Sequence, residues 1–162
     1  MMRDPSANPA IPPAWPDIAG RMEGLEHVLP VRVYYEDTDF SGFVYHANYI
    51  RFCERGRSDF LRIAGIHHSE LHWGGSDGRT GFVVRRMECD FLRPATIDDV
   101  LEVRTRFVEL RGARFELEQR ILRGEGMLFR ALVTAALVNA QGRPVRLPKE
   151  MRAAMEAVVW KD

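Results

Sequence analysis

Two neighbouring segments with a strict two-residue periodicity constrain the fold of this chain more than any other feature. Apolar and polar side chains alternate from Val100 to Leu110 and again from Arg114 to Leu122, which is typical of β-strands with one buried face. A short turn at Arg111-Gly112 separates the segments, so we expect them to pair as antiparallel neighbours. The apolar face of this pair needs a second layer to cover it.

One long amphipathic helix is the predicted cover. Between residues 48 and 64 the apolar side chains recur every three or four residues, and charged side chains occupy most of the other positions. Gly65 follows the last apolar position and is a natural left-handed C-cap. Gly56 lies in the middle of the helix, where glycine costs ~1 kcal/mol relative to alanine. A close approach of the helix to a sheet would explain this glycine.

Three more segments have strand character. The segment from Val31 to Tyr35 is rich in β-branched and aromatic residues, and a further strand is predicted from Phe82 to Phe91. The segment from Met127 to Asn139 is apolar on both faces and is predicted to be central or interfacial. A short terminal helix is expected over residues 148–158. One long helix against about five antiparallel strands predicts an α+β fold.

Composition limits the classes of protein to which the chain can belong. Its 162 residues fit one domain with a real core, and equal totals of 23 basic and 23 acidic residues argue against nucleic acid as the main partner. Cys53 and Cys89 match neither a metal-binding nor a redox motif, so two buried thiols in a reducing cytoplasm are expected. No apolar run reaches the ~18 residues that a membrane span requires.

The first 29 residues differ from the rest of the chain. They show no strand or helix period, which predicts a flexible arm over residues 1–29 and a single domain over residues 30–162. The arm is marked by its prolines, which are Pro5, Pro9, Pro12, Pro13 and Pro16.

The functional information is concentrated where the first predicted strand leads into the long helix. The strand ends in the acidic turn Glu36-Asp37-Thr38-Asp39, Ser41-Gly42 loosens the chain, and Val44-Tyr45-His46 leads to the helix. A carboxylate that faces a helix N-terminus lies close to N–H groups that favour negative charge. This arrangement suits attack on a carbonyl group. Turn formation alone would also account for the aspartates, because aspartate is common in turns and at helix starts.

The register of this motif resembles that of the acyl-CoA thioesterases of the hotdog fold. The resemblance runs through Asp37-Thr38-Asp39, Gly42, Val44-Tyr45-His46-Ala47-Asn48-Tyr49 and Phe52-Cys53-Glu54-Arg55. Within this fold, the motif most resembles the 4-hydroxybenzoyl-CoA thioesterase group and its branch associated with the bacterial Tol-Pal cell-envelope system. The resemblance implies about five antiparallel strands wrapped around one central helix. It also implies a homodimer or homotetramer.

The resemblance also implies roles for the motif residues. Asp39 would be the catalytic carboxylate, acting either as the nucleophile or as a general base on water. The backbone N–H of His46 would hold the oxyanion, and its imidazole would have an auxiliary role. Gly42 would let the turn pass close to the substrate. Asp37 would support the loop, and its charge could raise the pKa of Asp39.

Three other residues have open alternatives. Other hotdog thioesterases use a helix glutamate, which makes Glu54 a rival to Asp39, although a surface or interface ion pair with Arg51 or Arg57 is the preferred interpretation. Asn48 either caps the helix, which is preferred, or binds the acyl carbonyl. Tyr45 either lines the substrate pocket or belongs to the core, and the same choice applies to Tyr34, Tyr49 and Phe52.

No metal or cofactor is expected. His68 and His72 have the spacing of two helix metal ligands, but the sequence offers no third ligand at a matching spacing. Cys53 falls on the apolar stripe and reads as a buried structural thiol. The phosphates of coenzyme A call for surface cations, for which the candidates are Arg85, Arg86, Arg143, Arg146 and Lys149.

The predicted function is metal-independent hydrolysis of an acyl-CoA thioester to free acid and CoA, with an acyl group on acyl carrier protein as a second substrate form. A dehydratase or hydratase of the same fold is disfavoured, because those families place their histidine and carboxylate differently. The alternative from another class is a non-catalytic acyl-CoA or acyl-carrier-protein binding or scaffold protein.

Overall fold

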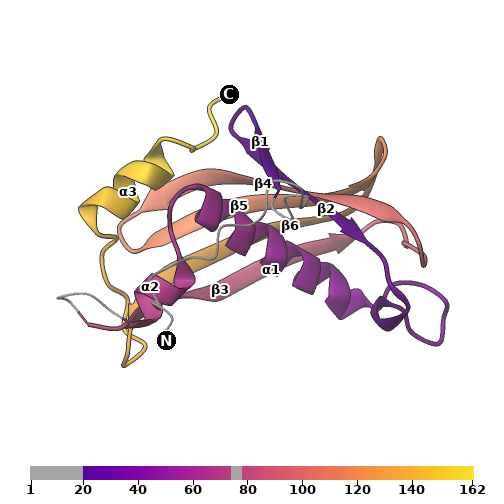
Figure 1. Cartoon of the computed structure of the whole chain (residues 1–162), viewed down its shortest axis with the longest axis horizontal. Helices are drawn as coiled ribbons and strands as arrows, with labels where there is room; N and C mark the ends of the chain where they lie inside the picture. The colour runs from indigo at the N-terminus through magenta and orange to yellow at the C-terminus, as the bar shows by residue number, and fades with distance from the viewer. Residues whose placement is uncertain (1–19, 74–77) are drawn as a thin grey trace, which may run out of the picture.

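The computed structural model describes residues 20–73 and 78–162. Within these ranges the chain forms a six-stranded antiparallel sheet with the order β1-β2-β4-β5-β6-β3. The strands are β1 (Arg21–Glu23), β2 (Glu26–Arg32), β3 (Thr80–Phe91), β4 (Val100–Arg111), β5 (Arg114–Arg123) and β6 (Gly126–Asn139). The helix α1 (His46–Ile63) lies along one face of this sheet (Figure 1). This confirms the predicted α+β hotdog architecture.

The two alternating segments form the neighbouring strands β4 and β5. Their inward side chains are paired across the strands, with Val103 opposite Ile121 and Phe107 opposite Leu117, and all four are buried. Their outward side chains are largely charged and form cross-strand ion pairs such as Arg106–Glu118, at 2.9 Å. The two-residue periodicity therefore predicted both the strands and the face that contacts α1.

The strand β6 is internal, as its two-sided apolar character predicted. It pairs with β5 on one side and with β3 on the other. The strand β3 pairs with β6 alone among the described strands, so its second edge is free in the single chain. Val83 and Val84 on β3 are exposed in the single chain.

Gly56 marks the closest approach of α1 to the sheet. A Cβ atom added at this position would lie 2.8 Å from Val103 Cγ1 and 3.2 Å from Thr105 Oγ1. The low helix propensity of glycine is therefore offset by contact of the helix backbone with β4. Gly65 follows the end of α1 with φ of +84°, which confirms the predicted left-handed C-cap.

The expected boundary between arm and domain is wrong, because residues 21–29 belong to β1 and β2. The strand predicted from Val31 to Tyr35 overlaps β2 at its last two residues alone, and the start of β2 was not predicted because two of its buried residues are polar. Glu26 is held by Arg104 and Arg120, while His27 is hydrogen bonded to Asp59 of α1 at 2.7 Å. Residues 1–19, for which a flexible arm was predicted, lie outside the described residues.

Two shorter α-helices and one turn of 3-10 helix (Tyr35–Asp37) complete the described chain. The helix α2 (His68–Trp73) follows α1, and α3 (Lys149–Glu156) lies within the terminal segment predicted to be helical. Met155 of α3 is buried in the core. Along the residues that the structure describes, no helix is both long enough and apolar enough to cross a membrane.

Candidate active site

Asp37 fastens the acidic turn to the start of α1. Its carboxylate is buried and accepts hydrogen bonds from the Tyr34 amide, at 2.8 Å, and from the Asn48 side-chain amide, at 2.9 Å. Its carbonyl oxygen accepts a third bond from the Tyr45 amide, at 2.8 Å. These bonds join both sides of the turn to the helix, so Asp37 sets the position of the whole loop.

Asn48 does not cap α1. Tyr45 occupies the N-cap position without a side-chain hydrogen bond, and Asn48 is the third residue of the helix. Its side chain is buried and donates to Asp37 instead. The preferred interpretation of Asn48 as a cap is therefore wrong, because the helix already begins at His46, two residues before Asn48, and a cap residue must precede the first helical residue.

Asp39 presents an ionised carboxylate at the surface of the same loop. Its Oδ1 atom accepts hydrogen bonds from the Ser41 hydroxyl, at 2.5 Å, and from the Ser41 amide, at 2.8 Å. These two bonds, with a smaller contribution from His46, lower the pKa of Asp39 below its ordinary value. The suggestion that Asp37 raises the pKa of Asp39 is wrong, since the net shift is downward and Asp37 is not among its causes.

The turn after Asp39 needs a glycine for its backbone conformation. Gly42 has φ of +83°, and its amide donates to the Asp39 carbonyl oxygen at 3.0 Å. The Asp39 amide in turn donates to the Phe43 carbonyl oxygen at 3.1 Å. A Cβ atom at Gly42 would meet no other atom within 4 Å, so within this chain the positive φ accounts for the glycine.

The N-terminus of α1 offers backbone donors close to this loop. His46 is the first helical residue, and the Asn48 amide is already bonded to the Tyr45 carbonyl oxygen at 2.8 Å. Across residues 20–73 and 78–162, no hydrogen-bond acceptor pairs with the amides of His46 and Ala47. These two N–H groups can therefore hold a developing oxyanion.

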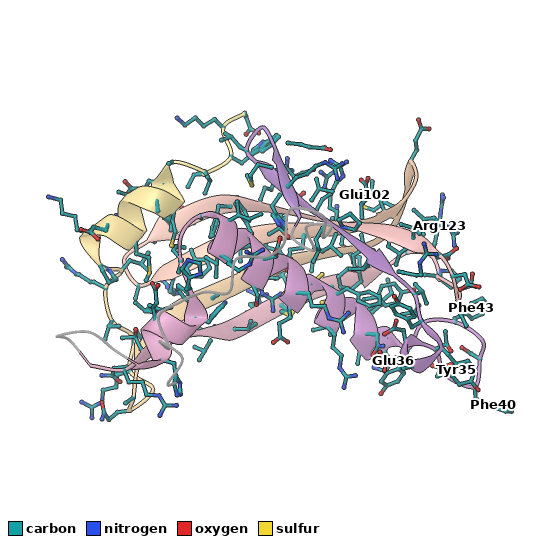
Figure 2. The ribbon with its side chains drawn as sticks, in the orientation of Figure 1. Tyr35, Glu36, Phe40, Phe43, Glu102 and Arg123 are labelled. Atoms are coloured by element: carbon teal, nitrogen blue, oxygen red, sulfur yellow. The ribbon has the colours of Figure 1, made fainter. Side chains whose placement is uncertain are left out.

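Asp39 and His46 line two separate cavities in the single chain. The first has a volume of about 530 Å³ and is lined by Tyr35, Thr38, Asp39, Phe40, Gly42 and Ile97. The second, of about 250 Å³, is lined by Val44, His46, Tyr49, Phe91, Leu92, Arg93 and Pro94. Tyr35, Phe40 and Phe43 project from one end of the molecule, where the first cavity lies (Figure 2).

Sequence reasoning missed the segment from Phe91 to Ile97 as part of this region. Leu92 and Ile97 are both exposed, and each lines one of the two cavities. The Ala95 amide donates to the buried Tyr49 hydroxyl at 2.9 Å, which holds the segment against α1. The sequence feature that could have indicated this segment is its run of apolar residues around Pro94, because polar residues are usual in a connection between two strands.

The tyrosines and Phe52 divide between pocket and core. Tyr49 and Phe52 are buried, whereas Tyr34 and Tyr45 remain exposed. Tyr49 packs against Phe129 of β6 at 5.5 Å between ring centroids and also contacts the His46 cavity. The exposed Tyr45 ring lies 4.5 Å from the His46 ring.

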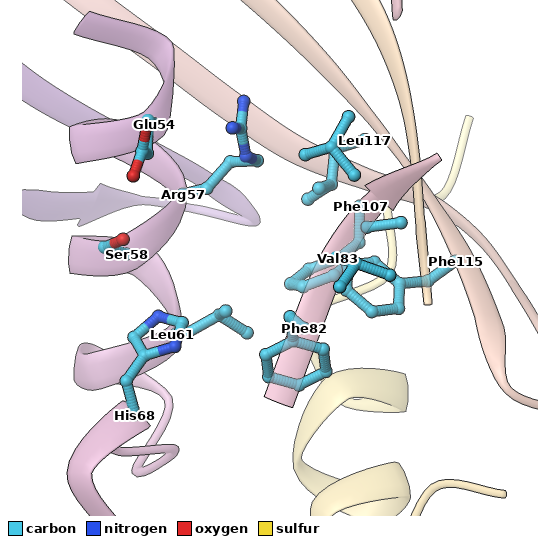
Figure 3. Close-up of a pocket in the computed structure, with 12 residues that line it drawn as sticks. Glu54, Arg57, Ser58, Leu61, His68, Phe82, Val83, Phe107, Phe115 and Leu117 are labelled. Carbon is cyan, nitrogen blue, oxygen red and sulfur yellow. The ribbon is translucent and has the colours of Figure 1, made fainter. Parts of the chain in front are cut away.

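Glu54 lies apart from Asp39, on the exposed side of α1 and one residue after Cys53. Among the described residues of the single chain, no ion pair joins it to Arg51 or Arg57, although its charge acts on Arg57. The ion pair at an interface between copies stays a prediction. Glu54 lines a third cavity, together with Arg57, near the C-terminal half of the helix (Figure 3).

The two cysteines differ in burial. Cys53 is fully buried, and burial raises the pKa of its thiol to about 12, which fits a structural role. Cys89 is only partly buried, contrary to expectation.

The other candidates are dispersed. In the described part of the chain, no group of three or more histidine, cysteine, aspartate or glutamate residues is placed to hold a metal ion. Arg86 forms an ion pair with Glu88, whereas Arg85, Arg143, Arg146 and Lys149 are exposed. The loop that follows β6 and carries Arg143 lies at the opposite end of the molecule from the Asp39 loop (Figure 1).

Known proteins of one family resemble this chain in sequence and in fold. Residues 33–155 match the model of the thioesterase-like superfamily. An acyl-CoA thioesterase, YbgC, of Haemophilus influenzae is 42% identical over 127 residues, which cover 78% of this chain and 91% of that protein. The crystal structure of a probable thioesterase from Bartonella henselae is 53% identical, with a TM-score of 0.74, and the match covers 76% of this chain and 99% of the other.

A more distant relative has a different named substrate. An acyl-acyl carrier protein thioesterase of Arabidopsis thaliana is 27% identical over 145 residues, which cover 88% of this chain and 73% of that protein. The family match spans the acidic turn, α1 and the strands β3 to β6. This chain therefore belongs to the thioesterase-like superfamily, and the family predicted from the motif is confirmed.

Proposed function

We propose that this protein hydrolyses acyl-CoA thioesters to free acid and CoA, with Asp39 as the catalytic carboxylate. The observation that carries the proposal is the position of an ionised, exposed Asp39 on a loop that Asp37 fastens to the N-terminus of α1. The named activity of the Haemophilus influenzae relative supports the same reaction. No metal ion takes part in the proposed mechanism.

Asp39 has two routes to the thioester carbonyl. It can attack the carbonyl carbon directly and give a mixed anhydride, which water then hydrolyses, or it can take a proton from an attacking water. Both routes require the ionised form, which the hydrogen bonds from Ser41 favour. The CoA thiolate is a good leaving group, so neither route requires a dedicated general acid.

The amides at the start of α1 would hold the oxygen of the carbonyl as it becomes negative. The donors are the N–H groups of His46 and Ala47, supported by the helix dipole. The His46 imidazole lines the adjacent cavity and serves an auxiliary, orienting role in this proposal. The substrate would therefore span the two cavities, with its carbonyl between Asp39 and the helix end.

Assembly, partners and location belong to the same proposal. The free edge of β3, with exposed Val83 and Val84, supports association of copies of this chain into a homodimer or homotetramer. Acyl carrier protein is a second possible carrier of the acyl group. The protein is proposed to act in the cytoplasm, and its link to the Tol-Pal system stays a prediction from the motif.

The test is thiol release from a panel of short, long and aromatic acyl-CoAs, with the same acyl groups offered on acyl carrier protein. Turnover that depends on acyl type would establish the activity and give the substrate class. Tight binding of every acyl-CoA without thiol release would contradict the proposal and favour the non-catalytic binding protein. Release only from acyl carrier protein would replace CoA as the carrier.

A further inference from the structure

The connection between β3 and β4 is bonded to the chain on both sides of the acidic turn. Before the turn, the Val33 amide donates to the Asp99 carbonyl oxygen at 2.9 Å. After the turn, the Val44 amide donates to the Ala95 carbonyl oxygen, also at 2.9 Å. Residues 95–99 therefore form a supporting segment for the whole loop.

The supporting segment also reaches both partners of the proposed reaction. Phe43 pairs with Thr96 in an antiparallel bridge, and the Phe43 carbonyl oxygen accepts a hydrogen bond from the Asp39 amide at 3.1 Å. The Ala95 amide donates to the hydroxyl of Tyr49, the fourth residue of α1, at 2.9 Å. The loop that carries the carboxylate and the N-terminal turn of α1 are thus held by one segment, so the shape of this segment sets the distance between them.

Asp99 fixes the shape of the supporting segment. Its Oδ2 atom accepts hydrogen bonds from the Thr96 amide, at 2.9 Å, and from the Thr96 hydroxyl, at 3.3 Å. The Asp99 amide donates in return to the Thr96 carbonyl oxygen at 3.2 Å. Arg123, at the end of β5, donates to the same Oδ2 atom at 2.6 Å. These bonds close the turn on itself and tie it to the sheet.

The ion pair between Asp99 and Arg123 is partly shielded from water. The Asp99 side chain is 19% exposed, and Arg123 lies at the same end of the molecule as Phe43 (Figure 2). Partial burial alone would raise the pKa of Asp99, but the hydrogen bonds from Thr96 and Arg123 lower it below its ordinary value. The carboxylate is therefore ionised at neutral pH, and charge-assisted bonds of this kind are roughly twice as strong as bonds between neutral groups.

We propose that Asp99 is a positioning residue for the hydrolysis, which through the supporting segment fixes the Asp39 carboxylate relative to the free amides at the start of α1. This role rests on the proposed function. Displacement of a reacting group by about 1 Å can cost about 100-fold in rate, so a small change in the segment is sufficient to impair the reaction. Arg123 contributes to the same role from β5.

Thiol release by the full-length protein, with the best acyl-CoA of the panel, tests this role. Asp99→Asn keeps the shape of the side chain but removes its charge. It should lower kcat by about tenfold or more, while KM changes by less than about twofold. The acid limb of kcat/KM should stay in place, because Asp99 is not among the causes of the lowered pKa of Asp39.

Variants of Arg123 keep the test independent of any folding defect in Asp99→Asn. Arg123 is exposed, so Arg123→Gln should fold normally and lower kcat by about threefold or more. Arg123→Lys keeps the positive charge and should restore most of the wild-type kcat. Glu118→Gln is the matched control, because Glu118 forms a partly buried ion pair with Arg106 between β4 and β5, and it should leave kcat unchanged.

The outcomes separate the positioning role from the reaction itself. Wild-type kcat in both Asp99→Asn and Arg123→Gln would reject the role and leave the proposed hydrolysis in place. An equal loss of kcat in Glu118→Gln, or a movement of the acid limb in Asp99→Asn, would also reject it, because the effect would then be general or electrostatic. If the wild type releases no thiol from any thioester, the hydrolysis is rejected and the role of Asp99 with it.

Discussion

The two ends of α1 differ in how their functional groups are held in place. At the N-terminal end, Asp39 is exposed, and the side-chain hydrogen bonds of Asp37 and Asp39 reach partners at most 11 residues away in sequence. In the C-terminal half, Arg57 is half-buried and positioned by Gln119, which lies 62 residues away in sequence. The first arrangement gives a carboxylate that stays ionised in contact with water. The second gives a cation that burial partly deprives of water.

The contact at Gly56 links the two ends, and changing it should have the largest effect. The Cβ atom that Gly56→Ala introduces would lie 2.8 Å from Val103 Cγ1. We therefore expect the free energy of unfolding to fall by about 1–3 kcal/mol, although the higher helix propensity of alanine opposes this loss. Thermal unfolding measures the effect, which should appear as a lower Tm. Gly81→Ala is the matched control, because its Cβ would meet no atom within 4 Å. Equal Tm values for the two variants would show that α1 does not depend on this close contact.

Removing the charge of Asp37 should affect the N-terminal end alone. Asp37→Asn weakens the acceptor for the Tyr34 amide and places a second amide against Asn48, so the free energy of unfolding should fall by about 1–3 kcal/mol. Misplacement of Asp39 should also lower kcat/KM by about tenfold or more. Urea unfolding and steady-state kinetics measure the two effects. An unchanged kcat/KM in Asp37→Asn would contradict the role of Asp37 in placing Asp39.

The hydroxyl of Tyr49 provides a smaller test of the same end. Tyr49→Phe leaves the buried Ala95 amide without its acceptor, which should cost about 1–2 kcal/mol. The segment from Phe91 to Ile97 should then exchange its amide hydrogens faster, while β4 and β5 keep their protection. Hydrogen exchange followed by mass spectrometry distinguishes these regions. An unchanged rate in this segment would remove Tyr49 as its anchor.

The smallest expected effect is a shift in the pH dependence of the reaction. Asp39 must be ionised, and its lowered pKa means that activity should persist below the pH at which an ordinary aspartate becomes protonated. Ser41→Ala removes the hydroxyl that contributes most to the lowered pKa, so the acid limb of kcat/KM should move to higher pH. A movement to lower pH would show that another group controls the limb.

The difference between the two ends also explains what the sequence could predict. The strands β4 and β5, α1, Gly56 and the loop around Asp39 are marked by residues close together in sequence, so periodicity and motif spacing found them. The start of β2, residues 26–30, was missed because Glu26 and His27 are buried only with distant partners, namely Arg104, Arg120 and Asp59. The cavity at Arg57 was missed for the same reason, since its lining comes from α1, α2 and four strands. No local pattern marks a site assembled over such separations.

The most direct test of the central claim is the comparison of Asp39→Asn with Asp98→Asn in thiol release from the best acyl-CoA substrate. Asp98 is an exposed aspartate with φ of +69°, a conformation that asparagine also accepts, so its variant should keep full activity. Asp39→Asn should lose about 100-fold or more in kcat/KM with little change in Tm, because its carboxylate is exposed and the asparagine oxygen can accept the same two hydrogen bonds from Ser41. Wild-type turnover by Asp39→Asn would contradict the account and move the catalytic carboxylate away from this loop.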